Sequence, residues 1–167
     1  ELQLYFDRVT ATVRGGGVGP EAPVLRAALE SLETDSGIHQ LVPYFVRFAQ
    51  EEVATSLKNL PRLTAVVAAT RALVSNPDVH VELYLHQLMP SVVTCMVAKR
   101  LSARPEDDHW TLRESAARVV ALICRKFGAA YPTIQPRITR TLLRALLDAK
   151  PLPTHFGAIA GLTALGP

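Results

Sequence analysis

The sequence predicts an all-α protein assembled from stacked pairs of helices, and three observations support this prediction. Apolar residues recur at helical spacing through most of the 167 residues. No segment alternates polar and apolar residues for long enough to predict a strand, and two short motifs return about every 46 residues. With 49% apolar and 20% charged residues, the composition is that of a folded globular chain and excludes intrinsic disorder.

An apolar face marks each predicted helix. The segments 2–13 and 85–96 show apolar residues three or four positions apart. The segment 110–127 shows the same spacing, which places six side chains on one side of an α-helix: Leu112, Ala116, Val119, Val120, Ile123 and Phe127. We therefore expect about eight helices in about four antiparallel pairs within a single domain, 1–167. The pairs span approximately residues 1–36, 37–77, 80–128 and 131–167.

Turn-forming residues set the ends of these helices. The run Gly15–Gly19 ends the first helix, and we expect it to be a flexible linker because it lacks the lysine and hydroxyl residue of a phosphate-binding loop. Carboxylates at 106–108 favour the N-terminus of the helix that follows them. The other breaks contain glycine, proline, serine or asparagine and fall at 35–37, 59–61, 75–77, 128–132 and 151–153.

Two motifs repeat with nearly the same period. The pattern A-x-x-x-A-L occurs at 68–73, 117–122 and 160–165, with spacings of 49 and 43 residues. A Leu or Ile two positions before a proline occurs at 41–43, 88–90 and 134–136, with spacings of 47 and 46. A period near 46 that holds two helices is typical of HEAT or armadillo arrays. Pro90 is the strongest candidate for a kink inside a helix, whereas Pro136 also suits a first helical turn.

No catalytic or metal-binding motif stands out. Cys95 and Cys124 lie 29 positions apart in apolar helical runs, so we expect small core residues rather than a disulfide or a zinc site. The cluster Glu106–His109 could in principle bind a metal, but consecutive carboxylates at a helix start more often cap it. The longest apolar stretches are far too short to span a membrane. We therefore expect neither an enzyme nor a bound cofactor or metal.

The charge is uneven along the chain. Residues 1–83 carry a net charge of −3 and residues 84–167 a net charge of +6. Arg137, Arg140 and Arg144 form a basic stripe at helical spacing, which could contact phosphate groups. Direct nucleic-acid binding through this basic half is therefore an alternative function. No aromatic residues interleave with the arginines to stack on bases, and a protein partner with an acidic face fits equally well.

Several segments together resemble a known family, the C-terminal HEAT-repeat domain of the sixth TATA-binding-protein-associated factor, a TFIID subunit. The resemblance lies in Tyr84–Cys95, His109–Arg118, Ile138–Leu142 and Gly157–Leu162, and also in Leu4–Phe6 and Leu41–Phe45. It implies a nuclear, non-enzymatic scaffold in RNA polymerase II initiation, with TFIID and SAGA-type subunits as partners. It also implies a histone-fold domain before this region. The chain begins at Glu1 without an initiator Met, so we expect a longer parent polypeptide.

A candidate partner-binding surface follows from the density of polar and aromatic residues beside the repeat seam. We expect it to include six residues: His109, Trp110, Arg113, Arg118, Arg137 and Arg140. The alternative for Arg113 is a structural role, in which it pairs with a carboxylate such as that of Asp108 between helices.

Overall fold

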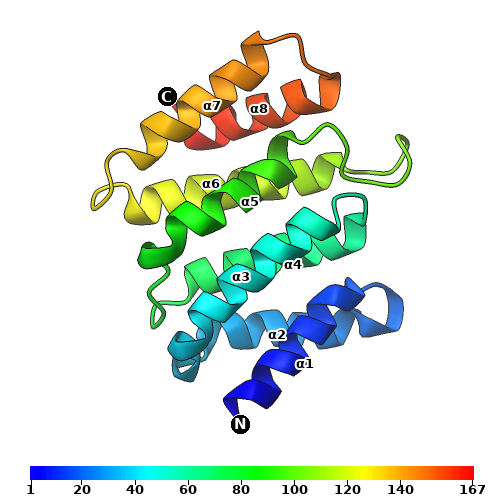
Figure 1. Ribbon diagram of the computed structural model, residues 1–167, viewed down its shortest axis with the longest axis vertical. Helices are drawn as coiled ribbons and strands as arrows, with labels where there is room; N and C mark the ends of the chain where they lie inside the picture. The colour runs from blue at the N-terminus through cyan, green and yellow to red at the C-terminus, as the bar shows by residue number, and fades with distance from the viewer.

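The computed structural model describes residues 1–167 and contains helices and no strands, which confirms the predicted all-α class. The helices follow one another along the longest axis of the molecule, with the two chain termini toward opposite ends (Figure 1). Their bounds are α1 Leu2–Gly15, α2 Ala22–Thr34, α3 Val42–Thr55, α4 Leu60–Ser75, α5 Leu85–Val97, α6 Trp110–Phe127, α7 Ile134–Leu147 and α8 Leu152–Leu165. None of these helices combines the length and the apolar composition that crossing a bilayer requires.

The helices form two layers. In one layer α2, α4, α6 and α8 contact one another in sequence, and the other layer holds α1, α3, α5 and α7 (Figure 1). Each odd-numbered helix packs on the even-numbered helix that follows it, so the chain is built from four antiparallel pairs, as predicted. The odd layer is less regular, because α3 packs on α5 whereas α7 packs on α8 and stands away from α5.

One hydrophobic core runs through the stack. A cluster of 36 buried residues extends from Val9 in α1 to Leu142 in α7. Where α8 meets the end of α5, glycine permits the close approach, since a Cβ on Gly157 would lie 1.8 Å from the carbonyl oxygen of Met96. Cys95 and Cys124 are buried and free, which confirms the expectation that they are small core residues.

Side chains from neighbouring repeats satisfy carbonyl groups at helix C-termini. The last carbonyls of a helix have no partner within the helix, so such bonds hold one repeat to the next. Arg62 donates to Arg14 O at the end of α1, and Asn76 donates to Leu32 O near the end of α2. Lys126 to Val74 O and Thr154 to Val97 O are further bonds between repeats, whereas the bond from Arg113 to Met96 O joins the two helices of one pair.

The prolines of the repeated motif occupy different helical positions. Pro43 is the second residue of α3 and Pro136 the third of α7, so both lie in a first turn, where the missing N–H costs little. Only Pro90 lies inside its helix. Pro43 lies in a first turn because a 3-10 turn at Ser36–Leu41 directly precedes α3.

The run Gly15–Gly19 is a packed turn rather than the expected flexible linker. Gly16, Gly17 and Gly19 all have φ between 59° and 76°, the left-handed region that glycine tolerates best. A Cβ on Gly17 would lie 2.2 Å from Leu25 Cδ2, so the turn also lies tightly against α2. Glycine is needed here for both conformation and space.

Candidate partner-binding surface

The start of α6 packs against the C-terminal end of α5, and Arg113 is completely buried at this junction. Its Nε donates a hydrogen bond to His109 Nδ1 at 3.0 Å, and its Nη1 donates to the carbonyl oxygen of Met96 at 3.0 Å. Its Nη2 is buried without a partner. Arg113 therefore has no surface to offer a partner protein, which corrects its assignment to the exposed binding surface.

The charge of Arg113 is compensated by dipoles rather than by a carboxylate. Met96 O belongs to the last turn of α5, the negative end of that helix dipole. Burial lowers the pKa of Arg113 to about 10. The pairing with Asp108 considered above is also wrong, because that carboxylate accepts from the backbone N–H and the hydroxyl of Thr111, as a capping group does.

His109 is a buried, neutral partner of Arg113. Nδ1 can accept a hydrogen bond only when it carries no proton, so this contact assigns the ring proton to Nε2. Burial lowers the pKa of His109, and the neighbouring charge of Arg113 lowers it further. His109 therefore positions Arg113 from within the fold and does not belong to an accessible surface.

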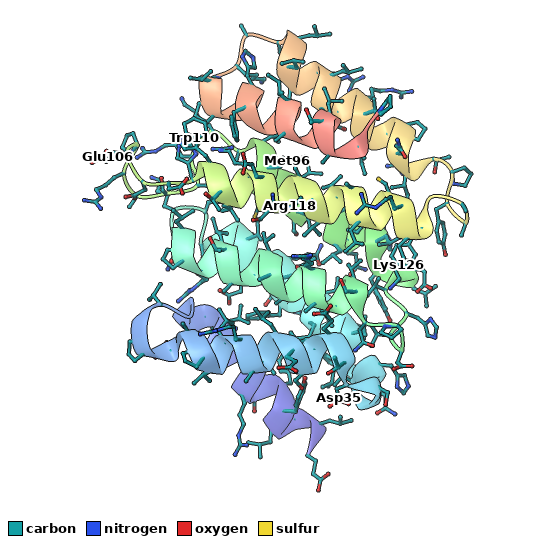
Figure 2. All side chains as sticks on the ribbon, turned by 180° about the vertical axis from the view of Figure 1, so that it is seen from behind. Asp35, Met96, Glu106, Trp110, Arg118 and Lys126 are labelled. Carbon is teal, nitrogen blue, oxygen red and sulfur yellow. The ribbon has the colours of Figure 1, made fainter.

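Trp110 joins α6 to α8 and keeps part of its ring at the surface. Its ring lies 4.1 Å from the ring of His109, centroid to centroid, and meets Phe156 of α8 edge-on at 4.9 Å and 70°. Figure 2 shows Trp110 at the N-terminal end of α6, opposite the end that carries Lys126. Of the three residues expected at this junction, Trp110 alone is partly accessible.

The other three expected residues are exposed but do not form one patch. Arg118 lies on α6 in the even-numbered layer (Figure 2), whereas Arg137 and Arg140 lie on α7 in the other layer. The last two also line different depressions. Arg140 borders a hollow of about 860 Å³ beside the end of α6, together with Arg144 and Leu147. Arg137 borders a groove on the α5 side of its helix.

This groove, which we call the α5–α7 groove, has a volume of about 510 Å³ and lies where α7 stands away from α5. Two rows of side chains at helical spacing form its floor: Leu85, Met89 and Val93 from α5, and Ile134, Ile138 and Thr141 from α7. Polar residues at its margin include Glu82, His86, Tyr131 and Arg137. Six of the residues that line it are hydrophobic.

Inspection of the sequence did not single out the groove. Met89 belongs to the apolar face expected for residues 85–96, and Val93 widens that apolar face beyond the residues needed for the core. That excess is a signal that could have indicated an unfilled surface. Sequence reasoning also missed Glu52, a buried carboxylate of α3 that lies 2.7 Å from Arg14 and 3.5 Å from Arg62 and links three helices. No group of three or more His, Cys, Asp or Glu side chains could hold a metal ion.

Comparison with known proteins agrees with this architecture. The family model for the TAF6 C-terminal HEAT repeat domain matches residues 1–167. The chain is 48% identical over 169 residues to Transcription initiation factor TFIID subunit 6b of Arabidopsis thaliana, covering 99% of this chain and 31% of that protein. It is 46% identical over 168 residues to the SAGA complex/transcription factor TFIID complex subunit Taf6 of Schizosaccharomyces pombe, covering 99% and 36%.

A solved structure shows the same fold. The TAF6 C-terminal domain from Antonospora locustae matches with a TM-score of 0.84 and 30% identity, over 99% of this chain and 78% of that one. The chain spans about a third of the length of the two relatives named above. The resemblance carried by the four segments from Tyr84 to Leu162 is thereby confirmed, and the chain belongs to the family of TAF6 C-terminal HEAT repeat domains.

Proposed function

We propose that this chain is a non-catalytic scaffold domain of a TFIID subunit and that it holds other subunits together during RNA polymerase II transcription initiation. The observation that carries the proposal is the match of the whole chain to the TAF6 C-terminal family, together with a two-layer helix stack that exposes long helical surfaces. The printed name of the fission-yeast relative includes the SAGA complex, so SAGA-type subunits are further proposed partners. The proposed location is the nucleus.

The distribution of perturbed titratable groups supports a role without catalysis. Burial raises the pKa of the Cys95 thiol to about 12, which leaves it neutral and a poor nucleophile at physiological pH. Arg113 and His109, whose pKa values are lowered, bind each other and a helix end inside the core. These three groups line neither the hollow beside the end of α6 nor the α5–α7 groove. Cys124 does border the hollow, and burial raises the pKa of its thiol, which disfavours the reactive thiolate.

Direct DNA binding is the weaker candidate. No Asp or Glu occurs between Glu114 and Asp148, whereas six Lys or Arg residues do. Phosphate contacts along a duplex need several cations on one face. Arg118 lies in the other layer from Arg137, and Lys126 is engaged with the Val74 carbonyl, so the cations are divided among separate surfaces.

The test compares the full-length nuclear protein with a variant that lacks residues 1–167, each purified through an affinity tag and analysed by quantitative mass spectrometry. We expect the deletion to remove a subset of the TFIID or SAGA-type subunits. A histone-fold partner held by another part of the polypeptide should remain. Unchanged composition would contradict the scaffold role. If the deletion instead abolished a duplex DNA binding that weakens steeply with salt, and left all subunits in place, the nucleic-acid alternative would be favoured.

A further inference from the structure

We propose that the α5–α7 groove is the docking site for one amphipathic α-helix of a partner protein, with apolar residues three or four positions apart between a basic and an acidic residue. The inference rests on the proposed scaffold function and assigns that function a site and a class of ligand. Each part of the assignment follows from the lining of the groove.

The floor of the groove matches a helix. Leu85, Met89 and Val93 follow one another at intervals of four residues along α5, and Ile134 and Ile138 do the same along α7. Side chains in such rows form ridges into which the ridge of a third helix packs. There is no sheet edge to which an extended strand could add, since the fold contains only helices.

The length of the floor sets the length of the ligand. The step from Leu85 to Val93 spans eight residues of α5, which is about 12 Å of helix. A docked helix therefore engages the groove over roughly two turns, enough to insert two or three apolar side chains. Leu85 and Ile138 are already buried, whereas Met89, Val93 and Ile134 keep exposed area for a ligand to cover.

The polar groups at the margin specify the flanking charges. Glu82 has one carboxylate oxygen, Oε2, that is buried without a hydrogen-bond partner, and its other oxygen lies 3.6 Å from His80 Nδ1. The rest of the Glu82 side chain is about a third exposed and pairs with no Lys or Arg, so a cation from the ligand would be favoured beside it. Arg137 is exposed, forms no ion pair and would bind a carboxylate.

The backbone adds a third polar feature. Pro90 lies inside α5 and has no N–H, so the carbonyl oxygen of His86 cannot receive the usual helical hydrogen bond. His86 and Pro90 both border the groove. A donor on the ligand helix could occupy this acceptor, which would help to fix the register of the ligand along α5.

The mixed charge favours a protein over a nucleic acid. Glu82 would repel a phosphate backbone, and Arg137 is the one unpaired cation that lines the groove besides the titratable His86. A single arginine supplies too few contacts for duplex binding, whereas one basic and one acidic margin suit a dipolar peptide helix.

The experiment uses the full-length protein in its nuclear assemblies. A photoreactive p-benzoylphenylalanine replaces Thr141, an exposed residue on the α7 side of the groove, and in a parallel sample it replaces Arg118 in the other layer. We expect the Thr141 probe to link to a single peptide of another protein that has the apolar spacing and flanking charges given above. The Arg118 probe should not link to that peptide. The peptide is identified by mass spectrometry of the adduct.

Variants test whether the groove itself is used. Met89→Asp should reduce the yield of that adduct about tenfold, and the exposed variant Arg137→Glu should reduce it severalfold without affecting folding. The control Leu147→Asp changes an exposed apolar residue elsewhere on α7 and should leave the yield within twofold. Charge reversal of the acidic residue in the identified peptide should restore the adduct with Arg137→Glu.

Several outcomes would overturn the inference. They are an adduct with nucleic acid or with a second copy of this chain, a linked peptide without helical apolar spacing, the absence of any adduct, or an adduct insensitive to Met89→Asp and Arg137→Glu. Subunit composition is measured in the same samples. If one of these outcomes occurs while deletion of residues 1–167 still removes subunits, the groove assignment is refuted and the scaffold role is retained.

Discussion

Asn76 is the side chain whose removal we expect to loosen the first helix pair from the rest of the stack. It is fully buried just after α4, and its Nδ2 donates to Leu32 O at 2.8 Å and to Asp35 O at 2.9 Å. Its Oδ1 accepts from the backbone N–H of Asp78 at 2.9 Å. The substitution Asn76→Ala removes all three bonds and leaves the Leu32 carbonyl buried at the end of α2.

The magnitude follows from these bonds. A buried acceptor without a partner costs about 1–3 kcal/mol, and each of the two partly solvated bonds contributes roughly 1 kcal/mol. Removal of the amide also relieves the cost of burying it, about 1 kcal/mol. We therefore expect the free energy of unfolding to fall by about 3 kcal/mol.

The assay is urea unfolding of residues 1–167 followed by circular dichroism, with Asn59→Ala as the matched control. Asn59 caps its own helix through the backbone N–H of Arg62 at 3.2 Å, so its loss should cost only about 1 kcal/mol. A lower slope for Asn76→Ala would indicate separate unfolding of α1 and α2. An effect within about 0.5 kcal/mol of the unmodified protein, or no larger than the control, would refute the reasoning.

Three further substitutions or conditions probe the repeat junctions. Gly157→Ala places a Cβ against the Met96 carbonyl, so it should lower the free energy of unfolding by about 3 kcal/mol in the same urea assay. The pKa of His109 is lower in the folded state than the usual value of 6.5. Its contribution to the free energy of unfolding should therefore be fully present above pH 6.5 and decrease as the pH falls below that value. One proton limits the change in the free energy of unfolding to about 1.4 kcal/mol per pH unit. Arg113→Met should reduce this pH dependence, as measured by denaturation at a series of pH values. Glu52→Gln leaves both arginine partners without their carboxylate and should cost about 2 kcal/mol, whereas a melting temperature that does not change would contradict that role.

Helix content and helix ends were predictable because they depend on local chemistry. Asn59 precedes α4 and caps it, and α2 ends directly before Asp35, as the breaks in the sequence indicate. Asn76 also ends α4 where the following proline disfavours helix. The conformation of the run Gly15–Gly19 was harder to predict, because its left-handed turn packs closely against Pro61 and Leu25 of other helices.

The candidate site was predictable only in part. Arg113 and Arg118 lie five positions apart on α6 among similar neighbours, yet one is completely buried and the other exposed. The burial of Arg113 depends on the end of α5, where Met96 O accepts its hydrogen bond from 17 positions away. Apolar spacing locates the core face of a helix, but it does not reveal when a charged residue lies on the border of that face.

Helical spacing, turn residues and repeats are properties of the linear order, so they were enough to predict paired helices with a period near 46 residues and to indicate the family. Which arginines reach solvent and where a groove opens depend instead on how the helices pack. The groove depends on how far α7 stands from α5, and the two apolar rows that line it belong to segments about 45 residues apart. The distance between α5 and α7 results from the packing of the whole stack, in which α7 packs against α8 rather than against α5.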